Sequence, residues 1–143
     1  MKRTLKALTV AASLMASSAS AFDAADVQRL KDTGKCEGCD LSRSKLNGIT
    51  LTNADATLEA ANLSNADLSG AFMPRISLIL SNLKGAVLLG ANLEGANLTS
   101  ADLRGANLDG ANLTDADLSS ALMQGAILCN TTMPDGSVSY SGC

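Results

Sequence analysis

Apolar positions recur every five residues through most of the chain. From Ala56 onward, Ala or another small residue precedes Leu by two positions, and Asn, Asp or Thr usually stands between them. The Leu position recurs at 58, 63, 68 and so on to 128, with Met at 73 and 123. Three looser units are centred on positions 41, 46 and 51, and a two-residue slip in phase at 54–55 separates them from the regular run. Repetition at a fixed spacing indicates a repeat architecture.

A period of five fits neither a helix nor a straight strand. In a helix, successive Leu would advance by roughly 140° and form no stripe, and in a strand an odd period would send alternate Leu to opposite faces. Ala and Leu two positions apart can share one side of a very short strand, with Asn or Asp pointing outward. The next two residues then turn the chain, and Gly suits the corner position that needs a positive φ. The pattern predicts a solenoid whose bore is filled by stacked Leu and Ala.

The consecutive Ala-(Asp/Asn)-Leu-x-x units resemble the pentapeptide-repeat family over residues 39–128. The resemblance implies an all-β fold, namely a right-handed quadrilateral β-helix with four units in each coil of twenty residues. At a spacing of ~4.8 Å between strands, about four and a half coils would extend roughly 20 Å along the axis.

The first 21 residues are typical of a signal peptide. Three basic residues fall within the first six positions, an apolar stretch covers 7–16, and the small residues 19–21 suit a cleavage site. We therefore expect export to a periplasmic or secreted location, or to the thylakoid lumen in a photosynthetic source. The apolar stretch is too short to span a bilayer, so we expect no stable membrane insertion after cleavage. The alternative is an uncleaved amphipathic helix.

Both ends of the solenoid need caps, and the flanking segments suit that role. In 22–38, Asp23 can cap a helix over about 24–33, Val27 and Leu30 share one face of it, and Gly34 suits its end. This helix would lie over the first coil; the alternative is a helix that docks on a partner. In 129–143, a Pro-Asp-Gly turn predicts a tail folded over the last coil.

Four Cys in an exported chain suggest two disulfides, with three possible connectivities. On the solenoid that the resemblance implies, Cys36 and Cys39 lie at the first coil and Cys129 follows the last. A bridge needs Cα atoms within about 7 Å, so the expected pairs are Cys36–Cys39 and Cys129–Cys143. The same separation argues against zinc bound by four Cys. A thiol-redox protein using Cys36 and Cys39 remains an alternative, although the motif follows a predicted helix end instead of opening a helix.

Composition excludes most enzyme chemistry. The chain has no His and no Trp, one Tyr and two Phe, which removes Ser-His-Asp triads and His-ligated metals and leaves little to stack on bases. Its net charge is −3, and losing the three basic residues of the signal segment leaves 8 basic against 14 acidic residues, or −6. A negative charge disfavours nucleic-acid binding. We therefore expect no catalytic residues, no cofactor, no metal and no nucleic-acid partner.

Exceptions to the polar outer surface define a candidate interaction patch. We place Phe72, Ile79 and Leu80 on adjoining faces near a common corner, and Val87 and Leu89 on another face. Exposed apolar clusters can mark binding surfaces. The alternative is that a local bulge or the phase slip buries some of these side chains.

The sequence therefore predicts a non-enzymatic structural or protein-interaction module with an unknown protein partner, either monomeric or a weak lateral dimer. The resemblance also implies another possibility, because some family members mimic DNA and occupy topoisomerases. DNA carries one negative charge per ~1.7 Å of axis, whereas the acids of this chain are spread over different faces, with Arg104 among them. Export would also separate the chain from a cytoplasmic target. These acids are Glu94, Asp102, Asp109, Asp115 and Asp117.

Overall fold

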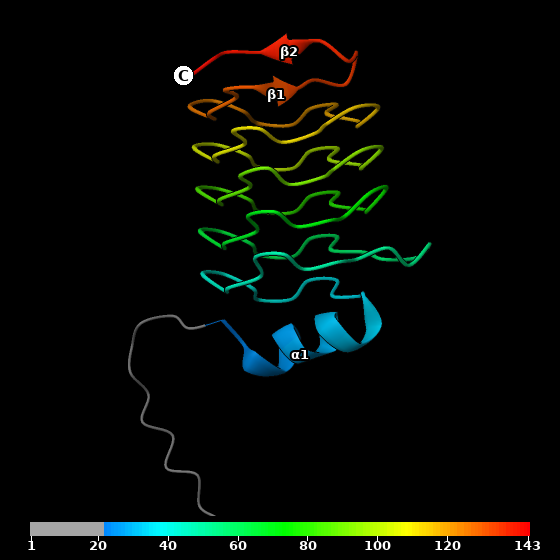
Figure 1. The fold of residues 1–143 in the computed structure, drawn as a ribbon. Coiled ribbons are helices and arrows are strands. Elements are labelled where there is room, and N and C mark those ends of the chain that lie inside the picture. The colour runs from blue at the N-terminus through cyan, green and yellow to red at the C-terminus, as the bar shows by residue number, and fades with distance from the viewer. Residues whose placement is uncertain (1–21) are drawn as a thin grey trace, which may run out of the picture.

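A computed structural model describes residues 22–143 as a stack of short coils closed at both ends (Figure 1). The predicted signal peptide lies outside the described residues. Helix α1 (Ala24–Thr33) covers the N-terminal end of the stack, and the strands β1 (Thr131–Thr132) and β2 (Val138–Ser139) form a hairpin at the C-terminal end. Within residues 22–143, no helix combines the length and apolar character needed to cross a bilayer.

Parallel bridges connect each coil to the next and divide the solenoid into four sides. Thr57 pairs with Ser77, and Ser77 pairs with Asn97, so one coil takes 20 residues. In each coil, a side contributes a single bridged residue, because two residues of every five form a corner. Continuous strands are therefore rare. The bridged columns are Lys35, Thr57, Ser77, Asn97 and Asp117 on side 1; Asp40, Asn62, Asn82, Asp102 and Leu122 on side 2; Lys45, Asp67, Val87, Asn107 and Ile127 on side 3; and Thr50, Phe72, Asn92, Asn112 and Thr132 on side 4.

The ladder extends beyond the residues 39–128 that the Leu pattern marks, and its columns make five rungs in place of about four and a half. At the first rung, the buried Cys36 takes the inward position that Leu holds elsewhere. At the last rung, Thr131 takes the place of Ala, and its hydroxyl donates a hydrogen bond of 2.6 Å to the carbonyl oxygen of Leu108. A pattern built on Ala and Leu does not detect either unit.

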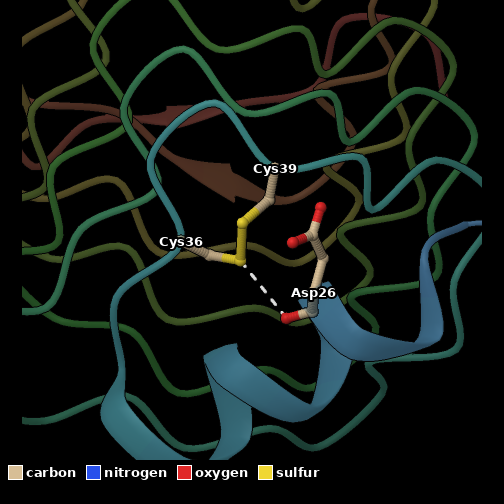
Figure 2. A group of neighbouring side chains, drawn as sticks. All are labelled: Asp26, Cys36 and Cys39. Atoms are coloured by element: carbon tan, nitrogen blue, oxygen red, sulfur yellow. Dashed lines mark hydrogen bonds between the residues drawn. A yellow bond between two sulfur atoms is a disulfide. The ribbon is translucent and has the colours of Figure 1, made fainter.

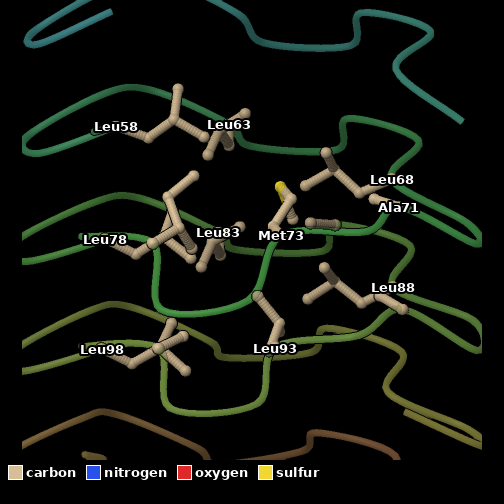
Figure 3. Close-up of a cluster of buried hydrophobic side chains, with 14 of the residues drawn as sticks. Leu58, Leu63, Leu68, Ala71, Met73, Leu78, Leu83, Leu88, Leu93 and Leu98 are labelled. Carbon is tan, nitrogen blue, oxygen red and sulfur yellow. The ribbon is translucent and has the colours of Figure 1, made fainter. Parts of the chain in front are cut away.

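The bore of the solenoid is filled by stacked Leu side chains together with the smaller Ala. Leu58, Leu78 and Leu98 stack on successive coils, as do Leu68 and Leu88 (Figure 3), and all are fully buried. Burying one Leu contributes about 1.5–3 kcal/mol relative to leaving it in water. The core therefore extends along the whole axis, and the sides are free to vary outside it.

The outward Asn and Asp residues fix the corners. The side-chain oxygen of Asn92 accepts a hydrogen bond of 2.9 Å from the backbone N–H of Glu94, and Asp67 accepts one of 3.0 Å from Ser69. Such contacts reproduce a backbone turn with a side-chain acceptor. Where an amide or carboxylate stands in the middle of a unit, it can therefore have a structural role as well as a surface position.

Helix α1 has the bounds that the sequence predicts and is tied to the first coil. Asp23 caps it by accepting a hydrogen bond of 2.9 Å from a first-turn N–H, and Gly34 ends it in a left-handed conformation with φ 70°. Leu30 is fully buried against the core. The carboxylate of Asp26 accepts a hydrogen bond of 2.9 Å from the backbone N–H of Asp40, which joins the helix to side 2. The helix thus covers the open bore.

The C-terminal tail covers part of the last coil. β1 and β2 pair antiparallel, and the N–H of Leu128 donates a hydrogen bond of 2.8 Å to the carbonyl oxygen of Ser141. The backbone at Gly142 lies against Ile127 on side 3. Leu122 on side 2 stays outside this cover and is 43% exposed.

Candidate functional site

The phase slip forms a loop that protrudes from the stack. Thr50 pairs with Phe72 across 22 residues, whereas Phe72 pairs with Asn92 across 20, so the first coil holds two extra residues. Residues 52–55 are exposed and extend beyond the outline of the neighbouring coils (Figure 1). The extra residues leave the column because the packed bore has no room for them. Lys35 forms an ion pair with Asp55, which ties the loop to side 1.

Two clefts flank this loop, which we call the 52–55 loop. The larger one, of about 650 Å³, runs along side 4 and the corner between sides 4 and 1; we call it the loop groove. It falls within the size range of ordinary ligand and peptide sites. Its lining residues are Thr52, Asn53, Ala54, Phe72, Pro74, Arg75, Asn92, Glu94, Gly95 and Asp115. The second cleft, of about 380 Å³, lies on side 1 between the loop and residues such as Glu59 and Ser77.

Phe72 gives the loop groove an apolar wall. Its position on side 4 is otherwise occupied by Thr or Asn, and its ring is 43% exposed. Pro74 follows it at the adjoining corner and also lines the groove. The groove therefore offers an exposed aromatic ring and a proline beside polar groups, and aromatic side chains are enriched among the residues that dominate protein interfaces.

Arg75 lines both clefts and is the cation between them. Its backbone has φ 60°, a left-handed conformation that costs a non-glycine residue about 1–2 kcal/mol. Its side-chain stem lies beside the backbone of Gly95 on the next coil. Among residues 22–143 the guanidinium forms no ion pair, although Glu94 and Asp115 line the same groove. The same left-handed φ recurs at other corners, such as Leu80 and Asp115, so what distinguishes Arg75 is its unpaired charge within the cleft.

The five residues of the candidate patch do not gather at one corner. Phe72 lies on side 4, whereas Ile79 and Leu80 form the corner between sides 1 and 2, so a whole side separates them. The sequence-based placement was wrong here, because eight residues carry the chain past more than one side. Val87 on side 3 and Leu89 at the corner between sides 3 and 4 lie nearer to Phe72.

Exposure also differs within the patch. Leu80 is 66% exposed and Leu89 is 40% exposed, whereas Ile79 and Val87 are half-buried. The candidate patch therefore divides into a Leu80 corner and a surface that runs from Val87 and Leu89 to Phe72. Of the exposed members, Phe72 is the one that lines the loop groove.

The structure pairs the cysteines as the sequence predicts, Cys36 with Cys39 and Cys129 with Cys143. Cys36 and Cys39 lie against α1 next to Asp26 (Figure 2), and they are only 1% and 2% exposed. The Sγ of Cys36 lies 3.2 Å from the carbonyl oxygen of Asp26. Thiol exchange needs access to a sulfur, and here the helix covers both sulfurs. This burial favours a structural link over the redox alternative.

Asp26, Cys36 and Cys39 also form the one group of three potential metal ligands within the described part of the chain, with ligand atoms within 4.8 Å of one another. Both sulfurs are joined to each other. A sulfur must be a thiolate to bind zinc, so this pair offers no metal site in its oxidised form.

The acids considered for DNA mimicry lie on different parts of the surface. Glu94 and Asp115 lie at the corner between sides 4 and 1, Asp109 at the corner between sides 3 and 4, and Asp117 on side 1. Asp102 on side 2 is paired with Arg104, whose Nη2 lies 2.6 Å from its Oδ2. These charges do not form a continuous track.

These features define a capped β-solenoid with short, bridged sides. A family model for pentapeptide repeats matches residues 61–99 and 96–133 with eight copies. The chain belongs to the pentapeptide-repeat family, which implies a right-handed β-helix. A search of the curated proteins found no significant match.

Several solved structures resemble the chain. A pentapeptide-repeat protein from the thylakoid lumen of Arabidopsis thaliana is 26% identical, with 74% of this chain and 70% of that one covered and a TM-score of 0.53. HetL, a pentapeptide-repeat protein involved in heterocyst differentiation regulation from the cyanobacterium Nostoc sp. strain PCC 7120, is 32% identical over 73% of this chain, with a TM-score of 0.39. This chain spans 53% of the length of HetL. A further Nostoc pentapeptide-repeat protein is 34% identical, with 73% of this chain and 74% of that one covered and a TM-score of 0.36.

Proposed function

We propose that the protein is a non-enzymatic protein-interaction module that binds a protein partner in the loop groove. The observation that carries the proposal is the combination, at the break in the repeat, of an exposed Phe72, Pro74 and an unpaired Arg75 within one cleft. Aromatic and Arg side chains are the residues most enriched among those that dominate protein interfaces. The rest of the solenoid then serves as a rigid support for this groove.

The working compartment that we propose is an exported one, either periplasmic, secreted or lumenal. The signal-like residues 1–21 and two Cys pairs support it, and a relative from a thylakoid lumen is compatible with it. Mass spectrometry of the protein from an exported fraction should find Phe22 as the first residue. Recovery of the intact chain from the cytoplasm would contradict this part of the proposal.

Partner capture tests the groove itself. The protein is cross-linked in its native compartment and recovered with its partners, either as the wild type or as Phe72→Asp. The matched control is Leu122→Asp, because Leu122 is also 43% exposed but lies on side 2, away from the loop. The proposal predicts a partner that is lost with Phe72→Asp and kept with Leu122→Asp.

Leu80→Asp separates the two parts of the candidate patch. Leu80 lies at the corner between sides 1 and 2, outside the loop groove, so this variant should also keep the partner. Loss of the partner with Leu80→Asp but not with Phe72→Asp would move the binding surface to that corner and overturn the assignment to the loop groove. The protein is proposed to act as a monomer, or as a weak lateral dimer, because α1 and the C-terminal hairpin cover the ends.

A further inference from the structure

A third cleft lies where α1 meets the first coil, on the surface away from the 52–55 loop. Its volume is about 420 Å³, and we call it the helix pocket. Ala24 and Val27 contribute one face of α1, and Phe22 lies beside them. Val27 is half-buried and packs on the core. The inner wall of the helix pocket is therefore apolar.

Three cations surround this apolar wall. Lys31 comes from the same face of α1 as Val27, Arg43 from the corner between sides 2 and 3, and Lys45 from side 3. None of the three forms an ion pair among residues 22–143. Asp67 is bridged to Lys45 one coil above; hydrogen bonds from Ser69 lower the pKa of its carboxyl group, and the charge of Lys45 contributes to the same shift. An apolar wall edged by unpaired cations complements a ligand with an apolar body and an anionic head.

Arg43 places a long cationic side chain at the edge of the helix pocket. Its backbone has φ 57°, the left-handed conformation that recurs at the corners of the solenoid, as at Asn65 on the next coil and at Gly85 and Gly105 on later coils. Because glycine adopts this conformation without the steric cost that a side chain incurs there, replacing Arg43 with glycine can remove the cation and keep the corner.

We infer that the helix pocket binds a monomeric long-chain carboxylate, a ligand of the fatty-acid class. The carboxylate lies among Lys31, Arg43 and Lys45, and the acyl chain lies on Val27 and Phe22. A concave site of this volume suits a single amphiphilic molecule. Binding to a flat anionic surface would instead require the three cations to protrude from the protein. Residues 1–21 contain no acidic side chain, so they supply no matching anion. This inference is independent of the partner proposed for the loop groove.

Titration calorimetry with a series of straight-chain carboxylates from octanoate to dodecanoate, below their micelle concentrations, tests the site. Saturable one-to-one binding is expected, and affinity should rise by about fourfold for each added methylene that the pocket buries. Dodecyltrimethylammonium, with the same chain and the opposite charge, should not bind. Absence of saturable carboxylate binding, or equal binding of the ammonium compound, would overturn the inference.

Two matched variants locate the binding. Arg43→Gly removes a cation while suiting the left-handed backbone, so the fold is kept, and dodecanoate affinity should fall about tenfold. Arg75→Gly makes the same change at a strained corner outside the helix pocket and should leave the affinity unchanged. Equal effects of the two variants would contradict the assignment. Sedimentation with vesicles of anionic phospholipid completes the test, since binding to vesicles without binding to free dodecanoate would replace the pocket with a membrane surface.

Discussion

Replacing Arg75 with glycine should stabilise the fold. Arg75 holds a left-handed backbone, φ 60°, directly below Gly95, which has φ 67°. That conformation costs an L-residue about 1–2 kcal/mol, whereas the greater unfolded-chain entropy of glycine costs about 0.4–1 kcal/mol. Arg75 forms no ion pair among residues 22–143, so the main interaction lost is the packing of its stem beside Gly95. We expect Arg75→Gly to raise the free energy of unfolding by about 0.5–1 kcal/mol.

Urea denaturation followed by circular dichroism measures this change. With a slope of about 1–3 kcal/mol per molar urea, the midpoint should rise by about 0.2–1 M. Arg104→Gly is the control, because Arg104 is outside the left-handed positions and pairs with Asp102, so this variant should be less stable than the wild type. A lower midpoint for Arg75→Gly, or equal shifts for both variants, would refute the strain argument. Partner capture should fall with Arg75→Gly despite the gain in stability, since the guanidinium lines the loop groove.

Three further predictions concern the core, the tail and acid stability. Leu83→Ala should lower the free energy of unfolding by about 3 kcal/mol in urea, because Leu83 is fully buried in the bore; a loss below about 1 kcal/mol would mean that the bore collapses to fill the space. Replacing Cys129 and Cys143 with Ser opens a link of sequence separation 14 and should cost about 3 kcal/mol under non-reducing conditions; unchanged stability would show that the tail contributes nothing. The hydrogen bond from Arg104 lowers the pKa of Asp102 from 3.8 to about 2, so its stabilising effect is present above about pH 4 and is lost as the pH falls toward about 2. The stability difference between the wild type and Asp102→Asn should therefore shrink from about pH 5 to about pH 2, and a constant difference would contradict the assigned ion pair.

The sequence predicts the inside of this protein better than its outside. A period of five with Ala and Leu two apart allows one packing of the bore, and the buried Leu58, Leu78 and Leu98 stack as that pattern requires. The end units were missed because Cys36 and Thr131 occupy inward positions with side chains that the pattern does not include. The cysteine pairs could be predicted because the length of the solenoid separates its two ends.

The functional surface depends on details that periodicity does not determine. The pattern locates a two-residue slip, but packing decides that the extra residues protrude and create a groove beside Phe72. The left-handed φ at Arg43 and Arg75 is a property that many corners of the backbone share, so the absence of Gly at a corner does not by itself mark a functional position. The outward Asn and Asp residues looked like a featureless polar surface, whereas their oxygens hold the corners, as Asn92 does for Glu94.

Site-specific photo-cross-linking in the native compartment can show whether a partner binds in the loop groove. A photoreactive phenylalanine analogue replaces Phe72 in one variant and Leu122 in the other, two side chains that are each 43% exposed. We expect one discrete protein adduct from position 72, identified by mass spectrometry, and none of the same mass from position 122. Illumination that gives the same adduct from both positions, or an adduct from position 122 alone, would contradict binding in the loop groove.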